Sequence, residues 1–132
     1  MQETKGVANE FKSEAPVSGS FIKGVDFDNG LNVEVVGMEK FTPEDPKYGV
    51  SNQYGAGGVV IKDNWFVKQG ILTEGESFKY KFIIDGVEKS FDNNSLSFYF
   101  SFTKIDPVAG EKLCITRTKV TDTKVNWEIV EI

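Results

Sequence analysis

Hydrophobic and polar residues alternate along the segment Phe78–Ile84, where the even-numbered positions are apolar and lysines occupy two odd-numbered positions. An alternation with a period of two is typical of a β-strand that buries one face. Asp85-Gly86 follows directly, and this dipeptide favours the type I′ turn of a two-residue hairpin. The inward face of the return strand would then continue through Val87, Lys89 and Phe91. The pattern therefore predicts a β-hairpin.

Three other segments carry strand patterns. Leu31–Phe41 alternates through two valines, and Gly37 stands where a bulge would let the strand bend sharply. The last two strands are expected at Leu113–Val120 and Val125–Ile132, with a turn at residues 121–123.

The segment Leu96–Phe102 fits two periods. Period two would place its even-numbered residues on one face of a strand, and residue propensity favours that reading. Helical spacing would instead group Leu96, Tyr99, Phe100 and Thr103. Cap residues at 93–95 precede the segment and a Pro-Gly break at 107–110 follows it. Because these signals mark the start and end of a helix, we expect a short helix.

These elements give the order strand, strand, strand, helix, strand, strand, which is the order of a five-stranded Greek-key OB barrel. We therefore expect an all-β fold with one short helix, built as an OB-like five-stranded Greek-key barrel. The domain would span residues 19–132 and follow a mobile N-terminal arm at residues 1–18. Phe21–Phe27 is expected as a short edge segment that packs over the barrel.

A long, glycine-rich connection, residues 42–75, separates the first two predicted strands. Loops of this length inside a compact domain are usually functional or partly disordered. Its two apolar stretches, Val59–Ile61 and Trp65–Val67, could pair as an extra hairpin around a turn at Asp63-Asn64.

Composition excludes several kinds of chemistry. The chain has no histidine, so the usual general base and metal ligand are missing, and no Ser-His-Asp or Cys-His arrangement can be built. The one cysteine, Cys114, cannot form a zinc–thiolate site or a disulfide within the chain. We therefore expect a protein that is not an enzyme and that uses no metal or cofactor.

The net charge of −5 argues against a generic polyanion binder, because phosphate affinity needs clustered Lys and Arg. The charge is unevenly distributed: residues 1–75 carry seven basic and eleven acidic side chains, whereas residues 77–125 carry eight and six. No stretch approaches the ~20 apolar residues of a membrane span, and the N-terminal sequence lacks the apolar run of a signal peptide. We expect a cytoplasmic protein, or one of the host cytoplasm if it is viral, with no membrane partner.

The C-terminal half also resembles a known family. Its motifs, in chain order, are Lys79-Tyr80-Lys81-Phe82, Asp85-Gly86, Phe98-Tyr99-Phe100, Gly110-Glu111-Lys112, Ile115-Thr116-Arg117 and Val125-Asn126-Trp127. This succession is similar to small OB-fold single-stranded-DNA-binding-like proteins of phages and mobile elements. The resemblance implies a role in DNA replication or recombination, although the strongly basic groove of well-known members is missing here.

Single strands bind when bases stack on exposed aromatic rings while cations follow the backbone. Lys79 and Lys81 would project from the outer face of their strand, with other cations and loop aromatics nearby. The predicted nucleic-acid-binding residues are Lys79, Lys81, Lys89, Arg117, Lys119, Trp65, Phe66 and Tyr54. Lys89 and Arg117 share the inward parity of their strands. Lys89 could instead snorkel from the barrel end, and Arg117 could pair with an acid such as Asp85 or Glu88.

The sequence thus predicts a single-stranded DNA-binding protein, with RNA as an alternative ligand. Replication proteins and a second copy of the chain are further expected partners. The alternative function is a protein–protein interaction or structural module, such as a phage adaptor or inhibitor that uses the acidic N-terminal half and the long connection. A third alternative is a β-sandwich that binds carbohydrate or forms part of a particle.

Overall fold

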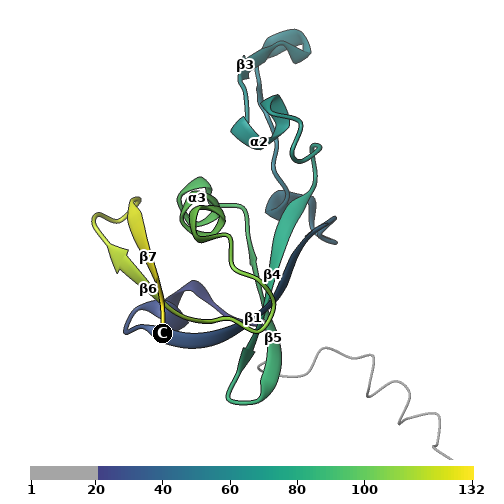
Figure 1. The fold of residues 1–132 in the computed structure, drawn as a ribbon. Helices are drawn as coiled ribbons and strands as arrows, with labels where there is room; N and C mark the ends of the chain where they lie inside the picture. Colours follow the sequence, from purple (N-terminus) through teal and green to yellow (C-terminus); the bar gives the residue numbers. More distant parts are fainter. Residues whose placement is uncertain (1–20) are drawn as a thin grey trace, which may run out of the picture.

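A computed structural model describes residues 21–132 (Figure 1), so the predicted arm at residues 1–18 lies outside the described residues. The described chain is mostly β, with one five-stranded antiparallel sheet in the order β5-β4-β1-β6-β7. Its strands are β1 (Leu31–Phe41), β4 (Ser77–Ile84), β5 (Val87–Asn93), β6 (Lys112–Lys119) and β7 (Val125–Glu131). The helix α3 (Leu96–Ile105) connects β5 to β6.

Shorter elements flank the sheet or lie within the long connection. They are η1 (Gly24–Phe27), η2 (Pro46–Tyr48), β2 (Gln53–Tyr54), η3 (Ala56–Gly58), β3 (Val60–Lys62) and α2 (Trp65–Lys68). Among residues 21–132, no helix has the length and apolarity needed to cross a bilayer.

β1 is the central strand because it pairs along both of its edges. Its first part pairs with β6 and its second part with β4, and the register with β4 shifts between Val35 and Gly37. A bulge of this kind bends a strand and increases its twist. The irregularity predicted at Gly37 is confirmed by this register shift. The predicted hairpin is confirmed as well, since Asp85 and Gly86 both take the positive φ that a type I′ turn requires.

The sheet does not close into a barrel within residues 21–132, where β5 and β7 are its two end strands. The gap between them is filled by η1. The ring of Phe27 is fully buried, with its centroid 4.9 Å from that of Phe91 on β5 and 5.4 Å from that of Trp127 on β7. Just before η1, the Ile22 N–H donates a 2.8 Å hydrogen bond to the carbonyl of Ser90. The expected edge segment therefore exists, and its side chains occupy the place where strand pairing would close a barrel.

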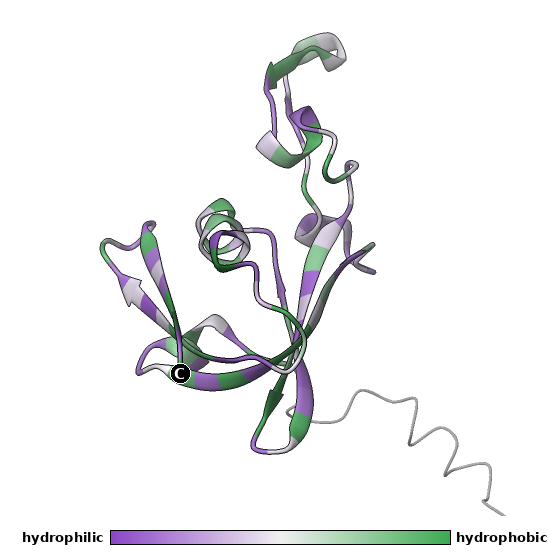
Figure 2. Ribbon diagram, in the orientation of Figure 1, coloured by the Kyte–Doolittle hydropathy of each residue, from purple (hydrophilic) through white to green (hydrophobic). Residues whose placement is uncertain are grey.

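The core lies between one face of the sheet and α3, and it is largely aromatic. Figure 2 shows hydrophobic residues along both the strands and α3. The ring centroid of Phe98 on α3 lies 4.6 Å from that of Tyr80, 5.1 Å from Phe91 and 4.9 Å from Trp127. Other buried residues of this core are Phe78, Phe82, Leu113 and Ile115, and Trp127 packs against the core while partly exposed.

The helix predicted from its cap residues is confirmed as α3. Ser95 Oγ accepts a 3.4 Å hydrogen bond from the Phe98 N–H, and Asp106 ends the helix in the left-handed conformation. Phe98 and Phe102 face the core, whereas Phe100, one of the residues that helical spacing groups on one face, is exposed. The spacing alone could not show which side of the helix is buried, because the helix carries aromatic side chains on several of its sides.

Residues 42–76 form an insertion that projects from the sheet between β1 and β4 (Figure 1). It contains an extra hairpin, but the pairing is between β2 and β3 and not between the two apolar stretches suggested by the sequence. Trp65 begins α2 because the Asn64 side-chain oxygen accepts hydrogen bonds from the Phe66 and Val67 N–H groups at 3.0 and 3.4 Å. A helix cap therefore replaces the expected turn.

The two legs of the insertion cross closely where it joins the sheet. The Val50 N–H donates to the Glu76 carbonyl and the Gly75 N–H donates to the Val50 carbonyl, both at 2.8 Å. A Cβ atom on Gly49 would collide with the carbonyl of Gly75. This position requires glycine because the obstacle is backbone, which cannot move aside as a flexible side chain can.

We expect Gly49→Ala to lower the free energy of unfolding by about 1–3 kcal/mol, the usual cost of forced overpacking. Gly37→Ala is the control, because nothing lies within 4 Å of its added Cβ and its φ is not positive. Urea unfolding of both variants measures the difference. Equal midpoints for the two variants would contradict a close crossing at Gly49.

Candidate nucleic-acid interface

One face of β1, β4 and β5 packs toward α3, and the opposite face, called the outer face here, carries a row of charged side chains. Glu39 pairs with Lys79 between β1 and β4, and Lys79 pairs with Asp92 between β4 and β5. Directly opposed residues in antiparallel strands point to the same side of the sheet. The three side chains therefore form a row, with Lys81 two residues along β4 on the same face.

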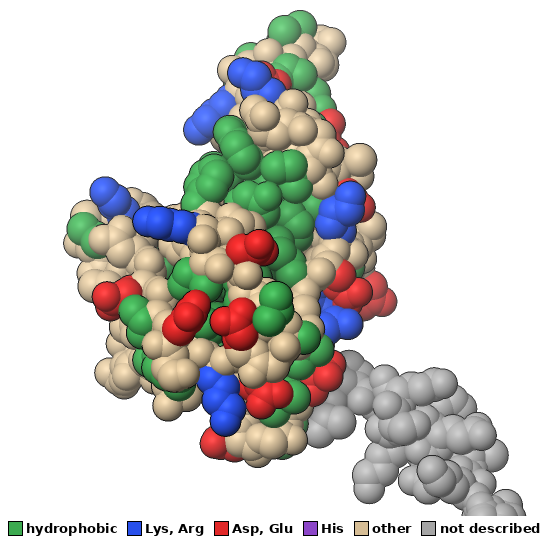
Figure 3. All heavy atoms as spheres, in the orientation of Figure 1, with side chains coloured by type: hydrophobic (Ala, Val, Ile, Leu, Met, Phe, Trp, Pro, Cys, Tyr) green, Lys and Arg blue, Asp and Glu red, His purple; other side chains and the backbone are tan. Residues whose placement is uncertain are grey.

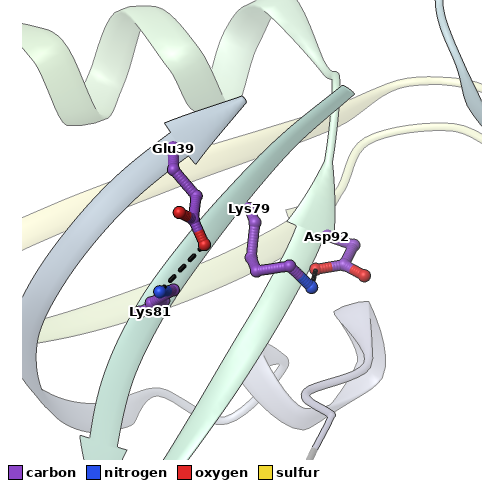
Figure 4. A network of polar contacts seen from close by, with 4 residues as sticks. All are labelled: Glu39, Lys79, Lys81 and Asp92. Atoms are coloured by element: carbon purple, nitrogen blue, oxygen red, sulfur yellow. Dashed lines mark hydrogen bonds and ion pairs between the residues drawn. The ribbon is translucent and has the colours of Figure 1, made fainter. Parts of the chain in front are cut away.

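Both lysines of the outer face are paired with acids (Figure 4). Lys79 Nζ lies 3.1 Å from Asp92 Oδ1, and Lys81 Nζ lies 2.8 Å from Glu39 Oε1. The hydrogen bond from Lys81 holds the pKa of Glu39 below its ordinary value, and the same contact raises the pKa of Lys81. The lysines lie where the sequence places them, but their charge is largely neutralised.

Two phenylalanines flank Lys79 on the outer face. Its Nζ lies 4.4 Å from the ring centroid of Phe41 and 5.7 Å from that of Phe21, distances at which a cation is attracted to an aromatic face. Sequence reasoning missed both rings. Phe41 lies two residues after Glu39 in the same strand, so the alternation could have shown that both side chains point to one face. Phe21 has no periodic signal, because it reaches this face through an isolated bridge to Ser90.

A hollow of about 860 Å³ lies beside this row, and Phe21, Phe41 and Tyr48 contribute its aromatic lining. Tyr48 is 62% exposed and belongs to η2. The Asn94 side chain donates a 3.3 Å hydrogen bond to the Tyr48 carbonyl, which ties η2 to the end of β5. The first part of the insertion thus brings an exposed aromatic ring to the outer face.

A second hollow, of about 260 Å³, adjoins the first and shares Phe21 with it. Lys79, Lys81 and Lys89 line this hollow. Lys89 is half-buried and lies opposite Phe82 in the sheet register, in agreement with its inward parity. Three of the eight predicted residues therefore border one depression, although the side chain of Lys89 starts from the opposite face of the sheet from those of Lys79 and Lys81.

Arg117 and Lys119 lie on β6 and line neither hollow. Arg117 makes a two-pronged contact with Asp28, in which its Nε and Nη2 lie 2.6 and 3.1 Å from the two carboxylate oxygens. This contact raises the pKa of Arg117 and lowers that of Asp28. An acidic partner was among the sequence alternatives, but it is Asp28, because η1 packs against β6. Arg117 thus fastens the segment that fills the sheet gap.

Trp65 and Phe66 lie on the opposite side of β4 from the paired lysines. The ring centroid of Phe66 lies 5.3 Å from that of Phe78, a core residue, and its side chain is 1% exposed. Burial therefore removes Phe66 from any surface on which a base could stack. Trp65 is half-buried, with its ring centroid 5.0 Å from that of Phe100 on α3. Trp65 and Phe66 thus dock α2 onto α3 and do not cover the outer face.

Tyr54, the last predicted residue, is exposed on β2 and lines neither hollow. Its hydroxyl donates a hydrogen bond to Glu74, which raises the pKa of Tyr54 and lowers that of Glu74. The side chain joins the hairpin to the second leg of the insertion.

Within the described residues 21–132, no three Cys, His, Asp or Glu side chains are grouped to hold a metal ion. No protein-family model matches the chain, and comparisons with curated proteins and with solved structures find no match.

Proposed function

We propose that this protein is a non-catalytic binder of single-stranded DNA that serves replication or recombination, and that the outer face of β1, β4 and β5 is its binding surface. The observation that carries the proposal is the convergence of three rings, those of Phe21, Phe41 and Tyr48, on one hollow beside Lys79. Bases stack on such rings without regard to sequence, because every base has a π-face.

The order of the strands supports this surface. β1, β4, β5, α3, β6 and β7 follow one another as the strands and helix of an OB barrel do, and β4 and β5 then correspond to its second and third strands. OB-like proteins bind oligonucleotides on the face of these two strands and with the loop between the first and second strands. The insertion corresponds to that loop. In this proposal η1 replaces the hydrogen bonds that would close the barrel.

The size of the depression suits a few nucleotides. The larger hollow, about 860 Å³, falls within the 300–1,000 Å³ typical of small-molecule sites. Each stacked base would contribute roughly 1–3 kcal/mol. RNA is an alternative ligand, since base stacking does not distinguish ribose from deoxyribose.

The proposal is tested by fluorescence anisotropy of a labelled oligo-dT of about 30 nucleotides, titrated with the protein at low and moderate salt. A duplex of equal length is the control. We expect saturable binding of the single strand and much weaker binding of the duplex, in which the bases are already stacked. Absence of oligo-dT binding at low salt would contradict the proposal.

A protein-interaction module is the second candidate, because the opposite side of the molecule exposes apolar residues. Hydrophobic side chains gather where the insertion meets α3 (Figure 3). On α3, Phe100 is 48% and Leu96 38% exposed. At the tip of the insertion, Val59 is 62% and Ile61 67% exposed. Exposed apolar patches often mark protein interfaces. Failure of oligo-dT to bind would favour this candidate.

A further inference from the structure

The paired state of the lysines bears on which part of a nucleic acid the outer face can recognise. We propose, on the basis of the proposed single-strand binding, that this face recognises bases and selects against phosphates. Asp92 and Glu39 would then be specificity-determining residues that reject polyanions without stackable bases.

Lys79 is enclosed on three sides. Its Nζ contacts Asp92 Oδ1 at 3.1 Å and lies over the rings of Phe41 and Phe21 at 4.4 and 5.7 Å. Only 22% of its side chain is exposed. A phosphate that approached this ammonium group would meet the negative charge of the Asp92 carboxylate, so two anions would compete for one cation. Lys79 therefore serves mainly as a shared contact of Asp92 and the two rings.

Lys81 is also paired with an acid, and this acid lies on β1. Its Nζ lies 2.8 Å from Glu39 Oε1, and the pKa of Glu39 is lowered first by this hydrogen bond and then by the charge of Lys81. Glu39 therefore stays ionised, and Lys81 stays paired, throughout the neutral pH range. A phosphate near Lys81 would face the negative charge of Glu39 as well.

The wider charge pattern of the two hollows is balanced. Their lining lysines are Lys23, Lys47, Lys79, Lys81 and Lys89, and their lining acids are Glu44, Asp45, Glu88 and Asp92, with Glu39 bound to Lys81 at the edge. Affinity for nucleic acid rises with the number of phosphates that are neutralised, and its salt dependence rises with the same number. A balanced surface therefore neutralises few phosphates.

The aromatic rings remain available to stack with bases while the lysines are paired with acids. Phe21 and Tyr48 are 51% and 62% exposed and border the larger hollow. A surface that attracts bases and repels uncompensated phosphates combines an attractive and a repulsive element, which is how specificity against a competing ligand is built. Duplex DNA would offer this face its phosphates while its bases stay inside the helix.

The test compares the wild-type protein with the double variant Asp92→Asn/Glu39→Gln. Three labelled probes of about 30 residues are used in anisotropy titrations over a range of salt: oligo-dT, an abasic strand with the same phosphates, and duplex DNA. Asp122→Asn/Glu128→Gln is the matched control, because it changes the net charge equally at exposed positions that line neither hollow.

We expect the wild-type protein and the control to bind oligo-dT with a weak salt dependence and to bind the abasic strand and the duplex much more weakly. The double variant should gain at least tenfold in affinity for the abasic strand and the duplex and should show a steeper salt dependence. Equal wild-type affinity for oligo-dT and the abasic strand, or an unchanged double variant, would overturn the inference while leaving single-strand binding intact. If the wild-type protein does not bind oligo-dT, the proposed function fails, and the inference fails with it.

Discussion

Replacing Phe98 with alanine is expected to lower the free energy of unfolding by about 3–5 kcal/mol, the usual cost of removing a large buried aromatic side chain. Phe98 is fully buried on α3 and joins three parts of the sheet, since its ring packs against Tyr80, Phe91 and Trp127. The cavity left behind would lie at the centre of the core, where surrounding elements cannot easily collapse. A loss of this size is a large fraction of the 5–15 kcal/mol that stabilises a typical domain.

Phe100→Ala is the matched control for Phe98→Ala. The two residues lie on the same helix and the substitution is chemically identical, but Phe100 is 48% exposed. Its change should cost about 1 kcal/mol, in the range of a single aromatic pair, because the main partner lost is Trp65. Urea unfolding followed by circular dichroism measures both. Equal losses for the two variants would show that α3 does not bury the face described here.

The double variant Phe21→Ala/Tyr48→Ala should lose most of the affinity for oligo-dT that the wild-type protein has. Both rings are exposed at the larger hollow and neither supports the core. With roughly 1–3 kcal/mol per stacked base, each lost ring weakens binding by a factor of about 5 to 150. The fold should be retained, because the residue that fills the sheet gap next to Phe21 is Phe27, which is unchanged.

Phe100→Ala also serves as the binding control for this pair, because its exposure is close to that of Phe21 but it lies on α3, away from the outer face. Anisotropy titrations at a single low salt concentration give the dissociation constants of oligo-dT for the wild-type protein, the double variant and Phe100→Ala. Binding that survives the loss of Phe21 and Tyr48 but is lost in Phe100→Ala would place the ligand on the side of α3.

Local patterns in the sequence predicted those parts of the fold that neighbouring residues determine. Alternation and the Asp85-Gly86 turn identified the β4–β5 hairpin, and Ser95 identified the start of α3. The pairing of β2 with β3 and the position of α2 were not predicted, because the cap at Asn64 competes with a turn at the same residue.

The candidate site was predicted only in part, since its charge depends on strand register. Alternation placed Lys79 and Lys81 outward, but it could not show that Asp92 and Glu39 lie within reach of them. That contact is fixed by pairing among three strands. The rings of Phe21 and Phe41 were missed as well. Phe21 could not be found from the pattern, because it joins β5 only through one isolated bridge to a residue far from it in the sequence.

The central claim, that single-stranded DNA binds on the outer face, is tested most directly by mapping backbone amide shifts of the ¹⁵N-labelled protein during titration with a short oligo-dT. We predict progressive shifts for Phe21, Tyr48, Lys79 and Ser90, and little change for Phe100 on α3. Shifts confined to α3 and the tip of the insertion would contradict the claim, as would a spectrum that does not change.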